Sequence, residues 1–314
     1  MHPKPILPAR LAPGSRVALV APSGPLPEPG GVARAAENCR LLGLEPVVMP
    51  NCRKRWGYLA GTDQERLSDL NAVLTDPAIA AVWCLRGGSG MNRIVHQLDF
   101  AAFARHPKVV LGYSDITVML LALWTKTGVV SFHGPMARAR LTDFSRAHLE
   151  GVLFNPVAAG TLDEDVAGSD TEPVVTIAPG IARGRLIGGN LSLLQTLIGT
   201  EYFPDLDGAI LFLEDVHEAI YRIDRILAHL RLAGALNRLA GVAIGRVTEI
   251  PPNAGDEAFG LAGVWQEYFG SLGIPVATGF PFGHIDSQWT LPVGVMAELD
   301  ATKGRLTLLE PAVG

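Results

Sequence analysis

The chain has 314 residues, 48% of them hydrophobic, and a formal net charge of −5 at pH 7. This length and apolar content allow one large hydrophobic core or two smaller ones, and a typical domain size of about 150 residues favours two domains. The mildly negative charge argues against a nucleic-acid partner, which usually requires a basic face, and the sequence holds no apolar stretch long enough to span a membrane.

The first half of the chain alternates short apolar runs with helical patterns. The expected strands are 16–21, 45–49, 78–85 and 109–111, and the expected helices are 32–42, 63–74 and 117–124. Thr62 is a plausible N-cap of the second of these helices. Continuously apolar strands separated by helices indicate a parallel sheet that is covered on both faces, so the predicted fold class is α/β.

The middle of the chain differs from what precedes it. Residues 155–180 contain Asn-Pro, Ala-Ala-Gly and Ala-Pro-Gly without a sustained period, which is typical of a linker. Beyond residue 183 a second organisation begins, with expected strands at 209–213, 241–245, 275–277, 295–299 and 305–309 and an amphipathic helix at 218–232. The sequence therefore predicts two domains joined by a linker.

Three predicted strand ends carry residues suited to chemistry, and open parallel sheets bind ligands at such ends. The glycines of Leu85-Arg-Gly-Gly-Ser-Gly90 could direct backbone N–H groups at an anion, although a flexible turn fits equally well. Ser114, between a strand and a helix, either occupies a nucleophile elbow or caps the helix, and Ile116 replaces the second glycine of the elbow pattern. Glu214 either orients a histidine or caps the next helix.

A serine hydroxyl needs a nearby base to be nucleophilic near neutral pH. His284 lies in a Gly- and Pro-rich loop, 279–287, and catalytic side chains concentrate in loops held by a rigid scaffold. His133 and His217 are rival candidates, and a purely structural histidine is the alternative for each of them.

Cysteine usage and the N-terminus bear on the compartment. Cys39, Cys52 and Cys84 form no Cys-x-x-Cys motif, and an odd, sparse count is typical of a reducing environment. The first ten residues hold three prolines and lack the apolar core of a signal peptide. We therefore expect a cytoplasmic protein with buried thiols, no membrane association, and neither a metal nor an organic cofactor.

Six motifs become specific when they are read together and in order. They are Tyr58-Leu-Ala-Gly-Thr-Asp63, Leu85-Arg-Gly-Gly-Ser-Gly90, Gly112-Tyr-Ser-Asp-Ile-Thr117, Gly188-Gly-Asn-Leu191, Leu213-Glu-Asp-Val216 and Gly283-His284. In this combination the chain resembles the LD-carboxypeptidase family of serine peptidases over nearly its whole length.

The resemblance implies a catalytic triad in the order Ser114, Glu214 and His284, as nucleophile, acidic member and base. It implies an oxyanion hole formed by the backbone N–H groups of Gly88 and Asp115. It also implies an N-terminal α/β domain (1–154), a linker (155–182) and a C-terminal β-rich α/β domain (183–314), with the triad assembled between the two domains.

Arg86 and Ser89 are the two positions of the glycine-rich loop with side chains to interpret. Arg86 is a candidate for binding the terminal carboxylate of a substrate, because a guanidinium binds a carboxylate through two parallel hydrogen bonds. An ion pair at the surface or between domains is the alternative for Arg86. Ser89 departs from the family pattern, which has an aromatic residue at this position, so a side-chain contact from it is in doubt.

The resemblance implies a homodimer that cleaves the L,D bond of a murein tetrapeptide and releases D-alanine during peptidoglycan recycling. A second possibility is an immunity-type enzyme that hydrolyses a peptidyl-nucleotide antibiotic such as microcin C. Such an enzyme needs an aromatic residue to stack on the base, and residues 155–185 contain none, although Trp56 or Trp289 could supply it. From other classes, a two-lobed binding protein without activity stays open, whereas an amidotransferase would need a cysteine at an elbow and Cys84 lies inside a predicted strand.

Overall fold

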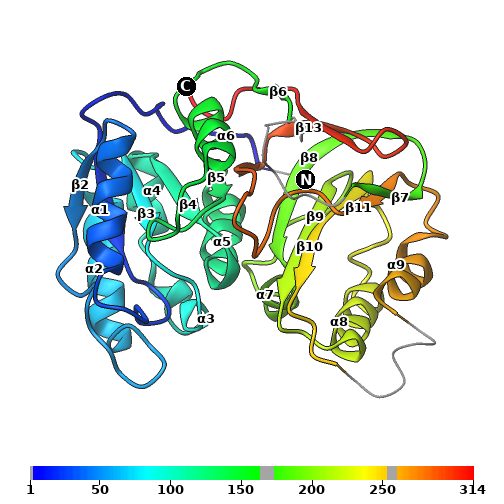
Figure 1. Ribbon diagram of the computed structural model, residues 1–314, viewed down its shortest axis with the longest axis horizontal. Coiled ribbons are helices and arrows are strands. Elements are labelled where there is room, and N and C mark those ends of the chain that lie inside the picture. Colours follow the sequence, from blue (N-terminus) through cyan, green and yellow to red (C-terminus); the bar gives the residue numbers. More distant parts are fainter. Residues whose placement is uncertain (1–2, 163–172, 253–259) are drawn as a thin grey trace.

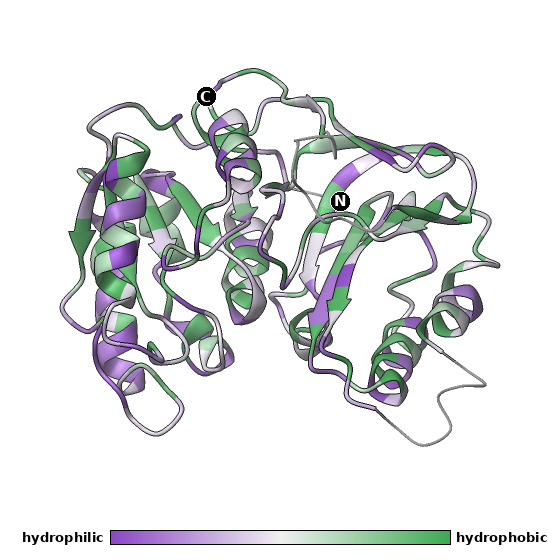
Figure 2. Cartoon of the chain, in the orientation of Figure 1, coloured by the Kyte–Doolittle hydropathy of each residue, from purple (hydrophilic) through white to green (hydrophobic). Residues whose placement is uncertain are grey.

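Two β-sheets with helices packed against them organise the protein (Figure 1). The computed structural model describes residues 3–162, 173–252 and 260–314. The architecture is mixed α/β, as the sequence predicts. Figure 2 shows hydrophobic residues along the strands and hydrophilic residues on the outward faces of the peripheral helices, and the buried hydrophobic side chains of both halves form one continuous cluster.

The first sheet is parallel except at one edge. Its strand order is β12-β5-β4-β3-β1-β2, and β12 alone runs antiparallel to its neighbour. Its strands are β1 (Arg16–Val20), β2 (Glu45–Val48), β3 (Ala81–Cys84), β4 (Val109–Gly112), β5 (Ser131–His133) and β12 (Leu291–Val293). The helical segments in this part of the chain are α1 (Gly31–Leu41), α2 (Asp63–Thr75), α3 (Met91–Ile94), η1 (Val95–Gln97), α4 (Phe100–Arg105), η2 (Ser114–Ile116), α5 (Thr117–Thr127) and α6 (Asp143–Leu153).

The second sheet has the order β6-β14-β13-β8-β9-β10-β11-β7, with a parallel centre and antiparallel flanks. Its strands are β6 (Gly160–Thr161), β7 (Val175–Ala178), β8 (Ile181–Asn190), β9 (Ile210–Val216), β10 (Gly241–Thr248), β11 (Val276–Thr278), β13 (Met296–Asp300) and β14 (Arg305–Leu308). The accompanying helices are α7 (Leu191–Thr196), α8 (Ile220–Leu232) and α9 (Leu261–Phe269).

Helix α5 lies between the two sheets. Its residues from Thr117 to Trp124 are all buried, and a helix that is apolar on every side belongs in a protein interior. A Cβ atom on Gly294, beside β12 and β13, would come within 2.2 Å of the Trp124 ring. The nucleophile candidate Ser114 immediately precedes this central helix.

Local sequence signals explain several boundaries. Thr62 caps α2 as predicted, because its hydroxyl accepts from Glu65 N at 3.3 Å while the Glu65 carboxylate accepts from Thr62 N at 2.9 Å. Gly128 ends α5 in the left-handed conformation at φ +74°, which glycine adopts without steric cost.

The segment predicted as a linker contributes to the second sheet. Strands β6 and β7 fall within residues 155–182, and residues 163–172 lie outside the described part of the chain. In addition, β12 comes from the C-terminal part of the sequence but completes the first sheet. The exact domain boundaries remain a prediction.

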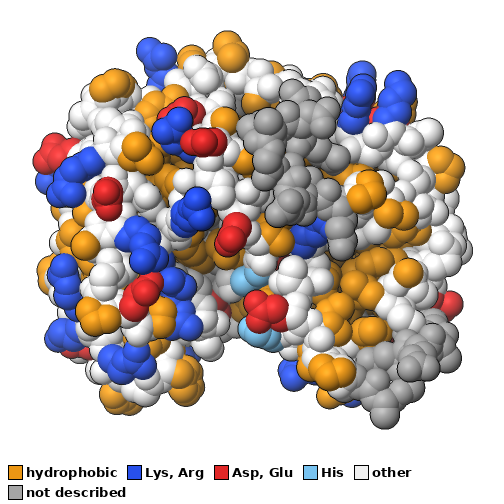
Figure 3. Space-filling view, in the orientation of Figure 1, with side chains coloured by type: hydrophobic (Ala, Val, Ile, Leu, Met, Phe, Trp, Pro, Cys, Tyr) orange, Lys and Arg blue, Asp and Glu red, His pale blue; other side chains and the backbone are white. Residues whose placement is uncertain are grey.

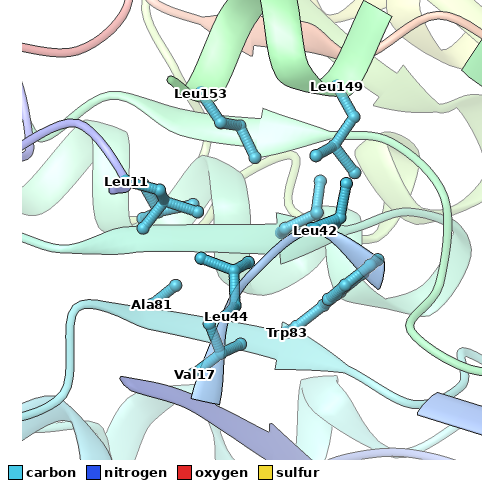
Figure 4. A pocket seen from close by; sticks show the side chains of 10 residues that line it. Leu11, Val17, Leu42, Leu44, Ala81, Trp83, Leu149 and Leu153 are labelled. Carbon is cyan, nitrogen blue, oxygen red and sulfur yellow. The ribbon is translucent and has the colours of Figure 1, made fainter. Parts of the chain in front are cut away.

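The core is tightly packed near the N-terminal sheet. Apolar side chains from the strands, from α6 and from the loop at Leu11 enclose a cavity of only about 10 Å³ (Figure 4). All three cysteines are buried and unpaired, and burial raises the pKa of Cys39 and of Cys52 to about 12. In the described ranges we find no helix with the length and apolar character needed to cross a membrane.

Candidate active site

Ser114 sits at a strained corner between strand and helix. It follows β4 and has φ of +60°, a left-handed conformation that costs a non-glycine residue about 1–2 kcal/mol. Neither η2 nor α5 begins with a side-chain cap, so the helix-cap interpretation of Ser114 is wrong. The corner instead has the strained geometry of a nucleophile elbow.

The glycine-rich loop after β3 packs directly against this corner. A Cβ atom on Gly87 would lie 2.9 Å from Ser114 Oγ and 3.4 Å from Asp115 N. Gly24 N donates to Gly87 O at 2.8 Å and holds the loop in place. The structure thus brings the loop containing Gly88 beside the backbone N–H of Asp115, the two groups predicted to bind an oxyanion.

The side chain of Asp115 points away from the nucleophile. It is buried, its carboxylate accepts from Met91 N at 2.9 Å, and burial raises its pKa. Asp115 therefore caps α3, the short helix after the glycine-rich loop, and not the helix that follows it in sequence. This contact ties the nucleophile corner to the loop opposite.

Glu214 and His284 form a hydrogen-bonded pair. His284 Nδ1 lies 2.7 Å from Glu214 Oε2, and the Glu214 side chain is fully buried. The alternative role of Glu214 as a helix cap is wrong, because β9 continues to Val216 and α8 begins only at Ile220 with Ala219 as its N-cap. A carboxylate at Nδ1 fixes the imidazole tautomer that leaves Nε2 as the acceptor.

The charge environment of His284 favours its protonated form. Burial acts to lower the pKa of His284, but the hydrogen bond that its ring donates to Glu214 and the negative charges of Glu214, Asp215 and Glu249 outweigh it, so the pKa is raised. An imidazole held this way stabilises the imidazolium that forms when it accepts a proton.

Ser114 and His284, which is hydrogen-bonded to Glu214, line the same cleft of about 400 Å³. It is lined by Arg86, Gly87, Gly88, Tyr113, Ser114, Met136, Arg138, Val216, His217, Glu249 and His284. The Tyr113 ring meets the His284 ring edge-on, with centroids 4.7 Å apart. Ser114, which follows β4 of the first sheet, and His284, in the loop after β11 of the second, thus line one cavity.

The rival histidines occupy different environments. His133 is fully buried, and burial together with the charge of His284 lowers its pKa to about 3. His217 lies at the cleft, where its Nε2 is 3.0 Å from Glu249 Oε2. Among the three candidates, His284 is therefore the one paired with a buried carboxylate beside Ser114.

Two hydrogen bonds of Asn190 link α5 to strands β8 and β9 near the site. The sequence alone indicated no role for Asn190. Asn190 N donates to Thr117 Oγ1 at 3.0 Å, and Asn190 Nδ2 donates to Asp215 Oδ1 at 3.0 Å. A Cβ atom on Gly189 would lie 2.7 Å from the Thr117 side chain. Thr117 is the first residue of α5, shortly after Ser114, and Asp215 directly follows Glu214. These hydrogen bonds therefore help to set the position of Ser114 relative to Glu214.

Comparison with known proteins decides the family. Residues 17–134 match the model of the LD-carboxypeptidase N-terminal domain, and residues 183–299 match that of the LD-carboxypeptidase C-terminal domain. A Streptomyces coelicolor protein assigned as a carboxypeptidase is 42% identical over 318 residues, which cover 98% of this chain and 97% of that protein. This chain belongs to the LD-carboxypeptidase family.

Relatives of this LD-carboxypeptidase family member include proteins named for murein peptides and proteins named for microcin immunity. A Bacillus subtilis protein assigned as a murein peptide carboxypeptidase is 34% identical, with 98% of this chain and 95% of that protein covered. The structure of muramoyltetrapeptide carboxypeptidase from Oxalobacter formigenes has 33% identity and a TM-score of 0.79 over 94% of this chain and 98% of that one. The structure of MccF, a microcin C7 self-immunity protein of Escherichia coli, in complex with glutamyl sulfamoyl guanosine has 25% identity and a TM-score of 0.87 over 99% of this chain and 100% of that one.

Arg86 lines the cleft of this LD-carboxypeptidase family member without a carboxylate partner among the described residues. One of its terminal nitrogens donates to Pro25 O. Burial and the charges of Arg138 and Arg55 lower its pKa. Among the described residues, Arg86 forms no ion pair with a carboxylate, and the charged neighbours that lower its pKa, Arg138 and Arg55, are both positive.

The two tryptophans considered for stacking on a nucleotide base lie outside the cleft lining. Trp289 is completely buried, so it cannot contact a ligand, whereas Trp56 is exposed but does not line the cleft. Ser89 is exposed, and it too lies outside the cleft lining. Within the ranges that the structure describes, we find no group of three or more His, Cys, Asp or Glu side chains placed to hold a metal ion.

Gly283 permits the contact between His284 and Glu214, and replacing it should damage the site. Its φ is +117°, and a Cβ atom there would lie 2.9 Å from Glu214 Cβ and 3.1 Å from Glu214 Oε2. We expect Gly283→Ala to lower kcat/KM by about 10²-fold, since a displacement near 1 Å is enough for such a loss. Gly273→Ala, with φ of +69° and no atom within 4 Å, is the control for backbone strain alone, and an equal loss in it would contradict this explanation.

Gly87→Ala should act on the nucleophile by contact. Its Cβ would press against Ser114 Cβ at 2.8 Å and Ser114 Oγ at 2.9 Å, so we expect kcat/KM to fall by about 10²-fold or more. Gly151→Ala, which meets no atom within 4 Å, should keep full activity. Kinetics of both variants, with thermal unfolding to confirm folding, check the prediction; wild-type kcat/KM in Gly87→Ala would refute the contact.

Proposed function

We propose that this protein is a serine LD-carboxypeptidase that cleaves the L,D peptide bond of murein tetrapeptide and releases the terminal D-alanine. The observation that carries the proposal is the Glu214–His284 hydrogen bond of 2.7 Å in the same cleft as the strained Ser114. The names of the murein-specific relatives support the substrate.

The proposed chemistry starts at Ser114. Its hydroxyl attacks the carbonyl carbon of the third residue as His284 Nε2 takes the proton, and Glu214 stabilises the imidazolium. The tetrahedral oxyanion receives hydrogen bonds from the backbone N–H groups of Gly88 and Asp115, and each such donor is typically worth about 10²–10³ in kcat.

The intermediate then collapses and the C–N bond breaks. His284 donates its proton to the departing amine of D-alanine, which leaves the tripeptide acyl group on Ser114. Water attacks this ester with His284 again as base, and Ser114 is released. Arg86 would hold the D-alanine carboxylate, which is what distinguishes a carboxypeptidase from an endopeptidase.

A second candidate is hydrolysis of a peptidyl-nucleotide antibiotic, which the high structural similarity to MccF favours. The lack of aromatic residues in 155–185 and the burial of Trp289 count against it, because stacking on a base needs an exposed ring. We include in the proposal, on the family resemblance alone, a cytoplasmic homodimer acting in peptidoglycan recycling.

The test offers purified protein L-Ala-γ-D-Glu-meso-diaminopimelate-D-Ala and, in parallel, a peptidyl-adenylate analogue. We expect free D-alanine from the first and no hydrolysis of the second. Hydrolysis of the analogue alone would favour the second candidate, and hydrolysis of neither would sink both peptidase assignments and favour a binding protein.

A further inference from the structure

Residues with strained backbones gather at the cleft. Among the described residues, three other than glycine have positive φ, and all three line the cleft: Ser114 at +60°, His217 at +60° and Glu249 at +54°. Such strain persists only where the surrounding structure imposes it, and it clusters at active sites and ligand clamps. The proposed nucleophile accounts for one of the three, whereas His217 and Glu249 have no part in the triad.

His217 and Glu249 follow the carboxyl ends of neighbouring strands. Strands β9 and β10 pair in parallel with Val216 opposite Thr248, so each strained residue is the first after its strand, and His217 N donates to Thr248 O at 3.1 Å. A glycine would make either turn without steric cost. Instead the chain places two polar side chains there, with His217 Nε2 3.0 Å from Glu249 Oε2.

The two walls of the cleft differ in charge. Arg86 and Arg138 line the wall on the side of the first sheet, while Glu249 is the acidic residue of the lining and lies on the opposite side. The Glu249 side chain is 61% exposed and the His217 side chain 70% exposed. Figure 3 shows His and acidic side chains together beside the notch between the two halves of this face.

We propose that Glu249, oriented by His217, is a specificity-determining residue that binds an ammonium group on the side chain of the substrate's third residue. The third residue is identified through the proposed function, since its carbonyl is the one that Ser114 would attack. Its side chain must leave the reaction centre along one wall of the cleft, and the wall opposite Arg86 is the one that carries Glu249.

The exposed pair admits such a ligand at little cost. Both side chains are largely exposed, and even a fully charged exposed pair contributes only about 0–1 kcal/mol. The Glu249 carboxylate can therefore keep its contact with His217 through one oxygen while the other accepts from an ammonium group. Lysine and diaminopimelate both carry a side-chain ammonium group.

The test measures peptide affinity by calorimetry, using Ser114→Ala protein so that turnover does not interfere. The peptides are L-Ala-γ-D-Glu-X-D-Ala, with X as L-lysine, Nε-acetyl-L-lysine or meso-diaminopimelate. We expect acetylation to weaken binding about tenfold, and we expect Glu249→Gln in the same background to abolish the difference. Glu37→Gln, at an exposed position on α1, is the matched control and should preserve the difference.

Two results would overturn the inference: equal affinity of the lysine and acetyl-lysine peptides together with a diaminopimelate peptide that Glu249→Gln does not weaken, or a lysine-to-acetyl-lysine difference that survives Glu249→Gln. Weakening of the lysine or the diaminopimelate peptide by Glu249→Gln supports it and shows which ammonium group is recognised. Wild-type protein that releases D-alanine from the diaminopimelate peptide while either overturning result holds would retain the proposed function and reject the inference, whereas no binding of any peptide would reject both.

Discussion

Ser114→Ala should lower kcat for D-alanine release from murein tetrapeptide by about 10⁶-fold, the loss expected when the nucleophile of a serine peptidase is removed. Among the described residues, no other serine, threonine or cysteine lines the cleft, and burial together with the charge of Glu214 raises the pKa of the Tyr113 hydroxyl to about 12, so the lining holds no second nucleophile of this kind. Substrate binding should change little, since Arg86 and the backbone donors remain. Single-turnover kinetics with calorimetric binding would separate the two effects.

The strain at Ser114 provides a control for folding. Alanine at φ of +60° is as strained as serine, so Ser114→Ala should unfold near the wild-type temperature. Ser114→Gly relieves the strain and should raise the free energy of unfolding by about 1 kcal/mol, while remaining inactive. Substantial activity in either variant would show that Ser114 is not the nucleophile.

Glu214→Gln should lower kcat by about 10⁴-fold, as loss of the carboxylate does in other triads, because the amide can hold His284 in the wrong tautomer. The carboxylate is fully buried and bonded to His284 Nδ1 at 2.7 Å. Its removal therefore takes away both the orienting contact and the charge that stabilises the imidazolium.

The pH profile should move in a defined direction. His284 acts as a base only when neutral, so kcat/KM falls as pH drops through its pKa. In wild type the acidic limb should lie above the ordinary histidine value of about 6.5, because Glu214 and its acidic neighbours raise the pKa of His284 against the effect of burial. In Glu214→Gln burial dominates and the limb should move to lower pH; an unchanged limb would mean that another group titrates.

Much of the fold could be predicted from periodicity and caps. Strands β1 to β4 of the first sheet and helix α2 with its Thr62 cap follow local rules that the sequence displays, whereas the short strand β5 was not predicted. Strands β6 and β7 could not be predicted, because short edge strands at 160–161 and 175–178 carry little pattern of their own and depend on β14 and β11 for pairing.

The site shows the same division. The local sequence predicted the strand–helix corner at Ser114. Around Glu214 the sequence did not distinguish the end of a strand from the start of a helix, and the structure shows that β9 continues through Glu214 to Val216. The hydrogen bonds of Asn190 and the paired turns at His217 and Glu249 depend on residues far apart in the chain. A sequence motif could indicate that Asn190 matters, but contacts between residues this far apart in the chain could not be predicted from it.

Labelling with a fluorophosphonate, which reacts with activated serines, tests directly whether Ser114 is the nucleophile. We expect one adduct, on the peptide containing Ser114, formed in parallel with the loss of D-alanine release, slowed by tetrapeptide and absent in Ser114→Ala. An adduct on a different residue, or full D-alanine release from protein labelled at Ser114, would show that Ser114 is not the nucleophile.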